Sequence, residues 1–383
     1  MKTLKIGIAG MGFIGPAHLE ALRRIPNLEV VAICHPGQEK AAAKARSLGV
    51  AKYYTEYDEL LSHDALDCVH ICTPNHLHYA MAKKALLAGI HVVCEKPLAT
   101  TITEAEELVT LAEKKGLVNA VHFNIRYYPL VRHMKQLCAT GTVGQIYSII
   151  GSYLQDWLFY QTDYNWRLEP ELSGESRAVA DIGSHLIDLL EYITGLSITA
   201  VFADMNTVHK TRKKPLKSIE TYSGKMLQPE DYADVPITTE DYASILLRFD
   251  NGNSGVATVS QVSAGRKNQL SLEIAGAKQN MKWNSEAPNE LWIGHRDVPN
   301  QLLLRDPALM ADSATQIAAL PGGHNEGFAD TSKQLFQEVY DAIRAGGQPA
   351  APTFPTFADG LRELVLCERI LESNKEQRWV EVE

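Results

Sequence analysis

The sequence lacks a long apolar run and an excess of positive charge. No stretch of about eighteen consecutive apolar residues, the length a membrane helix needs, occurs among the 383 residues. Lys and Arg number 37 against 46 Asp and Glu, so the net charge is -9. With no overall positive field to hold a chain of phosphates, nucleic acid is disfavoured as a partner. The sequence therefore predicts neither a membrane nor a nucleic-acid partner.

Cysteine is scarce and scattered. The chain has six, most of them in apolar stretches, as is typical of buried thiols in a reducing compartment: Cys34, Cys68, Cys72, Cys94, Cys138 and Cys367. The first ten residues lead into a predicted strand without the charged, apolar and small-residue zones of a signal peptide. We therefore expect a cytoplasmic protein without disulfides.

The first third of the chain alternates β-branched apolar runs with helical patterns. The runs predict strands over residues 4–9, 28–34, 66–72, 91–94 and 118–122, and the patterns between them predict helices over 15–24, 39–48, 76–88 and 103–115. Near-continuous Val and Ile runs separated by helices indicate a parallel sheet covered on both faces. We expect an α/β domain of the doubly wound Rossmann type over residues 1–123.

The remainder, residues 124–383, has a different pattern. One strong helix over 180–194 precedes strand-like segments over 198–208, 242–249, 252–262, 269–276, 280–283 and 290–294, and helices over 327–344 and 357–373 end the chain. Strands joined by short turns pair antiparallel, which predicts a C-terminal α+β domain on a mostly antiparallel open sheet. Residues 210–240 are polar and predict a solvated loop more than an anion site. The open sheet favours packing against a second copy, as a homodimer or homotetramer.

A glycine loop follows the first predicted strand. Gly10, Gly12 and Gly15 match G-x-G-x-x-G between a strand and a helix, the setting of a dinucleotide site. Gly10 permits the turn, Gly12 admits the pyrophosphate, and Gly15 lets the helix pack closely. At the end of the second strand, His35 stands where an acid would hold the adenosine ribose. The choice between NAD and NADP is therefore open.

Polar side chains at two further places are candidates for chemistry. Lys96 follows an apolar strand between Glu95 and Pro97, at the sheet edge where α/β proteins bind ligands. Asp181 and His185, four residues apart at the start of a helix, share one face, and a histidine beside a carboxylate is a general acid/base candidate. A helical pair without catalytic consequence is an equally good interpretation of these residues alone.

A histidine- and cysteine-rich segment invites a metal interpretation that we do not adopt. Cys68, His70 and Cys72 share one face of a central strand, with His76 and His78 beyond it. A doubly covered strand leaves little room for a coordination shell, so buried core cysteines are favoured and no metal is predicted. Asn75 and His78 are expected to approach the cofactor from the loop.

Taken together, these motifs resemble the glucose-fructose oxidoreductase/inositol dehydrogenase (Gfo/Idh/MocA) family. The resemblance spans nearly the whole chain and rests on residues 10–15, Thr73-Pro74-Asn75, Glu95-Lys96-Pro97, Asn124, Arg126, Asp181-x-Gly183-x-His185 and the ending 378–382. Residues 153–157 and Trp166-Arg167 are further similar to a branch that acts on an anhydro sugar.

The resemblance implies an NAD(P)-dependent sugar or polyol dehydrogenase, with NAD the expected cofactor and NADP the alternative. It implies catalytic roles for Lys96, Asp181 and His185, with His185 as base. Cofactor contacts are expected from Gly10, Gly12, Phe13, Ile14, Gly15, His35, Thr73, Pro74, Asn75, His78, Glu95, Lys96, Asn124, Trp166 and Arg167. Substrate contacts are expected from Lys96, Gln155, Trp157, Arg167, Asp181, His185 and His324.

Two other functions are open at this point. The same fold serves a sugar-pathway regulator that binds NAD(P) without turnover, although such a sensor need not keep Lys96, Asp181 and His185 together. A redox-neutral glycoside hydrolase with tightly bound NAD is the second alternative. The presence of all three residues favours catalysis.

Overall fold

The computed structural model describes residues 2–62, 66–216 and 228–382. The chain forms two compact units. Unit 1 comprises Met1–Asn124 and Phe328–Leu364, and unit 2 comprises Ile125–Gly327 and Val365–Glu383. Across the residues described, no helix has both the length and the apolar character needed to cross a bilayer.

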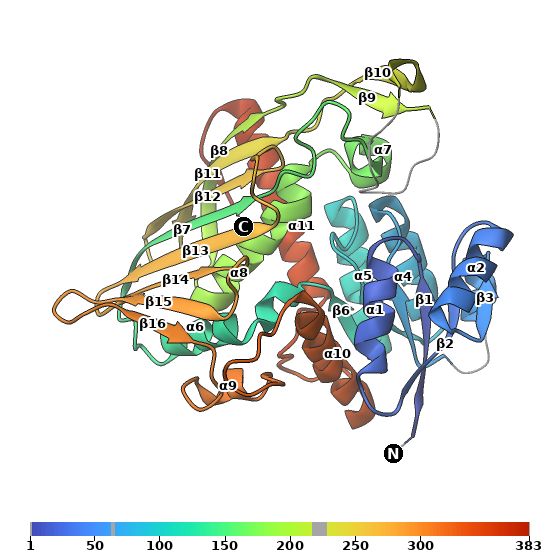
Figure 1. The fold of residues 1–383 in the computed structure, drawn as a ribbon, viewed down its shortest axis with the longest axis horizontal. Helices are drawn as coiled ribbons and strands as arrows, with labels where there is room; N and C mark the ends of the chain where they lie inside the picture. The colour runs from blue at the N-terminus through green and yellow to red at the C-terminus, as the bar shows by residue number, and fades with distance from the viewer. Residues whose placement is uncertain (1, 63–65, 217–227, 383) are drawn as a thin grey trace. The chain divides into compact units, whose positions relative to one another are not determined.

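Unit 1 is built on a parallel sheet of six strands in the order β3-β2-β1-β4-β5-β6 (Figure 1). The strands are β1 (Leu4–Ala9), β2 (Leu28–Cys34), β3 (Lys52–Tyr54), β4 (Cys68–Ile71), β5 (His91–Cys94) and β6 (Asn119–Val121). This order confirms the predicted doubly wound Rossmann fold. The sequence analysis missed β3, because three residues are too few to establish an apolar pattern.

Six helices of unit 1 lie between these strands along the chain. They are α1 (Ile14–Arg23), α2 (Gln38–Leu48), α3 (Tyr57–Leu61), η1 (Asn75–Leu77), α4 (His78–Leu87) and α5 (Ile102–Lys115). α10 (Phe328–Ala345) comes from much later in the chain and packs on α1. Arg24 at the end of α1 bonds Asp330 at 2.5 Å, and Arg344 donates to the Pro26 carbonyl at 2.7 Å.

This packing changes the division of the chain. The sequence analysis assigned everything after residue 123 to the second domain, whereas Phe328–Leu364 belongs with unit 1. α11 (Phe357–Glu376) begins in this segment and ends in unit 2. The sequence of this segment has no local pattern that shows which sheet its helices cover, because that sheet is formed by residues more than 200 positions earlier.

Unit 2 is built on a mixed sheet in the order β16-β15-β14-β13-β7-β12-β11-β8-β17. Its strands are β7 (Ile146–Leu154), β8 (Ile198–Asn206), β11 (Tyr242–Phe249), β12 (Ser254–Ser260), β13 (Gln269–Gly276), β14 (Asn280–Asn284), β15 (Glu290–Gly294), β16 (Gln301–Leu304) and β17 (Val380–Glu381). Only the β7–β12 pair is parallel among them, so the predicted mostly antiparallel sheet is confirmed.

One face of this sheet carries the core of unit 2. α6 (Pro129–Ala139) and α8 (Ser184–Thr194) lie over it (Figure 1). Leu186 of α8 packs so closely on β7 that a Cβ at Gly151 would lie 2.8 Å from its Cδ1. The glycine in the middle of β7 therefore allows the helix to approach the strand.

The other face leaves apolar side chains in solvent. Leu246 of β11 and Ile150 of β7 are 48% and 55% exposed, and both align with Val256 of the β12 strand between them. An apolar row across an open sheet favours the expected association of two or more copies. Self-association stays a prediction.

Two segments differ from the sequence analysis. Residues 211–215 and 232–236 form an antiparallel ribbon, β9 (Thr211–Pro215) with β10 (Tyr232–Pro236), where a solvated loop was expected. The rest of that predicted loop includes 217–227, which lie outside the described residues. The predicted helix over 180–194 begins with a π-helical turn, η4 (Val179–Gly183), before α8.

The remaining short helices are η2 (Asn124–Tyr127), η3 (Trp166–Leu168), α7 (Pro170–Ser173), η5 (Pro229–Asp231) and α9 (Asp312–Thr315).

Candidate active site

The glycine loop has the geometry that a dinucleotide requires. Gly10 has φ +92°, and a Cβ there would lie 2.4 Å from the Cys72 carbonyl oxygen. A Cβ on Gly15 would lie 2.1 Å from the Gly10 oxygen, so this helix residue must also be glycine. A Cβ on Gly12 would meet nothing within 4 Å. The protein therefore leaves open the space that a pyrophosphate at the N-terminus of α1 needs. Phe13 is 64% exposed beside this space, and Ile14 begins the helix.

His35 at the end of β2 is held by the glycine loop. The Met11 amide donates to its Nδ1 over 3.4 Å. Burial lowers the pKa of His35 below its ordinary value, and the positive charges of Lys44 and Lys40 lower it further. The imidazole is therefore neutral at physiological pH, and the positive charge at this edge comes from the two lysines of α2.

The turns after β4 and β5 are joined by His78. Its Nδ1 lies 2.7 Å from the Pro97 carbonyl oxygen and its Nε2 lies 2.8 Å from that of Thr73. The ring is fully buried at the start of α4, so it links the Thr73-Pro74-Asn75 turn to the Glu95-Lys96-Pro97 turn. Direct contact of His78 with a cofactor stays a prediction. The Lys96–Pro97 peptide is cis.

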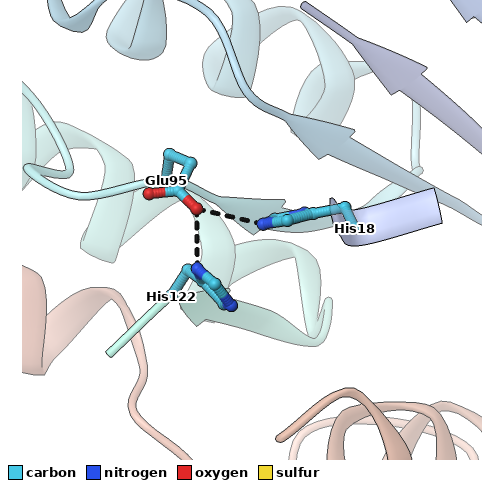
Figure 2. A group of neighbouring side chains, drawn as sticks. All are labelled: His18, Glu95 and His122. Carbon is cyan, nitrogen blue, oxygen red and sulfur yellow. Dashed lines mark hydrogen bonds and ion pairs between the residues drawn. The ribbon is translucent and has the colours of Figure 1, made fainter. Parts of the chain in front are cut away.

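Glu95 is the centre of a buried polar cluster that the sequence analysis did not foresee (Figure 2). Its Oε1 lies 3.0 Å from His18 Nε2 of α1 and 2.6 Å from His122 Nδ1, just after β6. Its Oε2 lies 3.3 Å from the Lys96 amide, which donates to it. The carboxylate therefore meets the backbone of the candidate catalytic lysine.

The cluster continues on both sides of Glu95. The Ser332 hydroxyl lies 3.0 Å from His122 Nε2, and the Tyr340 hydroxyl lies 2.8 Å from His70 Nε2. His70 Nδ1 lies 2.9 Å from His18 Nδ1, with the Cys72 sulfur 3.3 Å from that same nitrogen. Cys72 and His70 thus share a strand face, as predicted, and the face is turned toward α1 and α10.

One assignment of hydrogens satisfies the hydrogen bonds that join Glu95, the three histidines, Tyr340 and Ser332. Tyr340 donates to His70, His70 to His18, and His18 to Glu95, while Ser332 donates to His122 and His122 to Glu95. Each imidazole then uses one ring nitrogen as a donor and the other as an acceptor. His18, Glu95 and His122 present ligand atoms within 4.8 Å of one another. In the assignment above, hydrogen bonds from both imidazoles to Glu95 account for these contacts.

The pKa directions of His18 and Glu95 follow from burial and from their neighbours. Burial lowers the pKa of His18 from its ordinary 6.5 to about 4, His122 lowers it further, and Glu95 opposes the shift. Burial alone would raise the pKa of Glu95, but His122 and His18 hold it well below its usual range. A buried carboxylate that receives several N–H donors stays charged.

Asp181, a predicted substrate residue, lies in unit 2 in the π-helical turn η4. Arg167 Nε of η3 donates to its Oδ1 over 3.3 Å, and Gln261 Nε2 donates to its Oδ2 over 3.1 Å. The Arg167 guanidinium stacks on Trp166, with 4.6 Å between its carbon and the ring centroid. Asp181 therefore lies in a π-helical turn and not in the regular helix that was predicted. Turns of this kind are common at functional sites.

His185 begins the regular part of the helix and is buried. Its ring lies 6.4 Å from that of Tyr153, whose hydroxyl donates to Asn268 Oδ1 at 2.8 Å. Gln155 Nε2 donates to the same oxygen at 2.6 Å. Tyr153 and Gln155 thus share the Asn268 oxygen as an acceptor, while Trp157 lies in the turn after β7 and His324 is exposed.

The units divide the predicted site residues between them. Unit 1 brings together the glycine loop, His35 and the turns after β4 and β5, and its Asn124 Nδ2 donates to Thr331 Oγ1 at 2.7 Å. Unit 2 brings Asp181 together with Arg167. The meeting of Lys96 with Asp181 and His185 stays a prediction.

Four polar residues next to the predicted ones were missed. His18 had a signal, since it is a polar residue on the buried face of the helix after the glycine loop. His122, Gln261 and Asn268 had none, because each meets its partner across strands that are distant in sequence.

Comparison with known proteins agrees with the Rossmann fold of the first part of the chain and with the fold of the second domain. Residues 4–123 match the model of an oxidoreductase family with an NAD-binding Rossmann fold, and residues 131–282 match the GFO/IDH/MocA C-terminal domain. Levoglucosan dehydrogenase of Pseudarthrobacter phenanthrenivorans is 30% identical over 100% of this chain and 99% of its own. Glucose-6-phosphate 3-dehydrogenase of Bacillus subtilis is 28% identical over 99% and 98%.

Solved structures share the whole fold. A levoglucosan dehydrogenase in complex with NADH and L-sorbose superposes with a TM-score of 0.89 at 28% identity, covering 100% of both chains. An oxidoreductase domain protein from Kribbella flavida superposes with a TM-score of 0.89 at 31% identity, again over 100% of both.

The open space at Gly12 gives a prediction. We expect Gly12→Ala to weaken NAD binding about tenfold or more and Gly12→Val to remove it, because the added carbons meet only the ligand. Titration calorimetry with NAD measures the affinity, and circular dichroism checks that both variants are folded. Parent-like NAD affinity in a folded Gly12→Val protein would contradict this placement of the pyrophosphate.

The neutral His18 gives a second prediction, on stability. The pKa of His18 is about 4 in the fold against an ordinary 6.5. The contribution of the neutral His18 to the free energy of unfolding is therefore complete above pH 6.5 and is lost as the pH falls toward 4. At about 1.36 kcal/mol per unit, the loss is about 3 kcal/mol. His18→Gln keeps a donor to Glu95 but does not titrate, so its unfolding free energy should fall less over this range.

Hydrogen exchange of the β4 and β5 amides between these pH values measures the difference. His76→Gln, at an exposed histidine of η1, serves as the control for removal of one imidazole. Equal acid sensitivity in the parent and His18→Gln would show that His18 is not the group responsible.

Proposed function

Because the chain belongs to the Gfo/Idh/MocA family of oxidoreductases, we propose that it oxidises a secondary hydroxyl of a sugar, an anhydro sugar or a cyclic polyol, with NAD as cofactor. The family and its named dehydrogenases make this chain an NAD-binding oxidoreductase that acts on CH–OH groups. The proposal adds the substrate class and the residues.

One observation carries the proposal on the substrate side. Asp181 accepts hydrogen bonds on both oxygens, from Arg167 and Gln261, one helical turn before His185. Such a carboxylate orients a hydroxyl-rich ligand by accepting from it, and the stacked Arg167 and Trp166 offer a flat polar edge. Sugars and cyclic polyols combine hydroxyl donors with apolar ring faces and fit this surface.

The reaction removes a hydride from the carbon and a proton from the oxygen of a secondary alcohol, which becomes a ketone. The nicotinamide ring of NAD, when bound at the glycine loop, supplies the hydride acceptor. His185 takes the hydroxyl proton as general base, and the Lys96 ammonium stabilises the negative charge that develops on the oxygen. Asp181 holds the substrate in register with both groups. Levoglucosan, an anhydro sugar, is the first substrate to assay, because the relative from Pseudarthrobacter is named levoglucosan dehydrogenase.

The preference for NAD over NADP depends on the edge formed by His35. We expect His35→Asp to raise the ratio of NAD to NADP affinity about tenfold or more, because a carboxylate accepts from the ribose hydroxyls and repels a 2′-phosphate. Lys44→Met, which removes a positive charge facing His35, should weaken NADP more than NAD. Parallel titrations with the two dinucleotides measure the ratio. An unchanged ratio in His35→Asp would remove this residue from the ribose site.

The catalytic roles give a further prediction. Lys96→Ala and His185→Ala should each lower kcat by roughly 10²- to 10⁴-fold while NAD affinity changes little, since their stabilisation is concentrated in the transition state. The two losses should be less than additive in the double variant. Reduced-nicotinamide absorbance, across a panel of anhydro sugars, aldoses and cyclic polyols with NAD and NADP in parallel, identifies the substrate and measures the rates.

The control for the lysine variant is Lys278→Ala. This lysine is exposed and donates to the Gly141 carbonyl at the edge of unit 2. Near-parent turnover in Lys96→Ala or His185→Ala would remove that residue from the mechanism. Binding of NAD without reduction on any sugar would favour the regulator, and release of an aglycone without net NADH would favour the hydrolase.

A further inference from the structure

Gln261 lies between the candidate substrate-orienting carboxylate and a buried arginine. It follows β12 directly, and its side chain is 2% exposed. Arg177 Nη1 donates to its Oε1 at 3.2 Å, and its Nε2 donates to Asp181 Oδ2 at 3.1 Å. A guanidinium has only donors, so it determines which end of the amide faces it. The NH₂ end of Gln261 must therefore face Asp181.

Arg177 is itself held in one position. It is 1% exposed and donates to the Thr239 hydroxyl at 3.1 Å, the Thr239 carbonyl at 3.3 Å and Asp241 Oδ1 at 2.6 Å. Arg212 Nη2 bonds the same Asp241 oxygen at 2.6 Å. Burial alone would raise the pKa of Asp241, but the charge and hydrogen bonds of Arg177 hold it below its ordinary value. The anchor of Gln261 is thus a buried, ionised network.

This orientation limits what Asp181 can do. Its Oδ2 accepts from Gln261 and its Oδ1 accepts from Arg167, so both oxygens already receive a donor from the protein. Tyr153 also lies near enough for its pKa, which burial raises, to be raised further by the charge of Asp181. Donors on both oxygens favour the ionised carboxylate, which accepts from a ligand and cannot donate to it.

We propose that Gln261 is a positioning residue, which transmits the fixed orientation of Arg177 to Asp181 and keeps Asp181 an acceptor toward a substrate hydroxyl. The inference rests on the proposed function of Asp181. Because the amide is neutral, it directs the carboxylate without neutralising its charge. The substrate must then present a hydroxyl donor to Asp181, and a ligand with only acceptors at that place would be rejected.

Two substitutions at Gln261 separate positioning from packing. Gln261→Met keeps the length of the side chain but removes the donor, and we expect kcat/KM to fall about ten- to a hundredfold, with NAD affinity unchanged. Gln261→Glu keeps an acceptor for Arg177 but places a negative charge beside Asp181. The acid limb of the rate profile should move to higher pH in both variants, and further in Gln261→Glu. Gln136→Met, at an α6 amide that accepts from Ser313, is the matched control.

A readout without substrate tests the same point. The carboxyl ¹³C resonance of Asp181, assigned with Asp181→Asn, is followed against pH in the parent, Gln261→Met and Gln261→Glu. Titration midpoints that rise in this order support the proposal, even if no sugar is turned over and the proposed function fails. Parent-like midpoints in the two folded variants, or lower turnover that follows only a lower melting temperature, would overturn it.

Discussion

The candidate substrate residues of unit 2 depend on the Asp241 carboxylate, which Arg177 and Arg212 share at 2.6 Å each with all three side chains fully buried. A buried charge is costly unless it is paired and hydrogen-bonded, so the two arginines and the carboxylate hold each other in one arrangement. Arg212 extends it by donating to the Tyr160 and Asp163 carbonyls at 2.9 and 3.2 Å, which fixes the loop before η3. Arg177 extends it to Gln261 and so to Asp181.

Unit 1 also contains a buried carboxylate. Glu95 lies within hydrogen-bond distance of His18 and His122, which hold its pKa well below its usual range. Its second oxygen accepts from the Lys96 amide. The cluster thus helps to position the backbone of the candidate catalytic lysine.

How much of this was accessible from the sequence depends on how far apart the partners lie along the chain. The glycine loop and the strand ends were predicted, because each is a local pattern with one structural consequence. Asp181 and His185 were found together, but the π-helical turn η4 was not, since no residue pattern distinguishes it from a first helical turn. Arg212 was assigned to a solvated loop because its neighbours are lysines, whereas its partner Asp241 lies 29 residues further along the chain. The return of α10 to unit 1 was missed for the same reason.

In the proposed mechanism His185 takes the proton and Lys96 stabilises the developing charge, while Glu95 and Asp181 act as acceptors. Both carboxylates receive donors from the fold, which favours their ionised form. Direct pairing of Asp181 with Arg177 would also orient it, but a second guanidinium beside Arg167 would neutralise the carboxylate and weaken its attraction for a hydroxyl. Gln261 lies between them and fixes the orientation of Asp181 without adding the positive charge of Arg177. Asp241 pairs with that charge instead. The proposed role of Gln261 thus separates the orientation of Asp181 from the charge of Arg177.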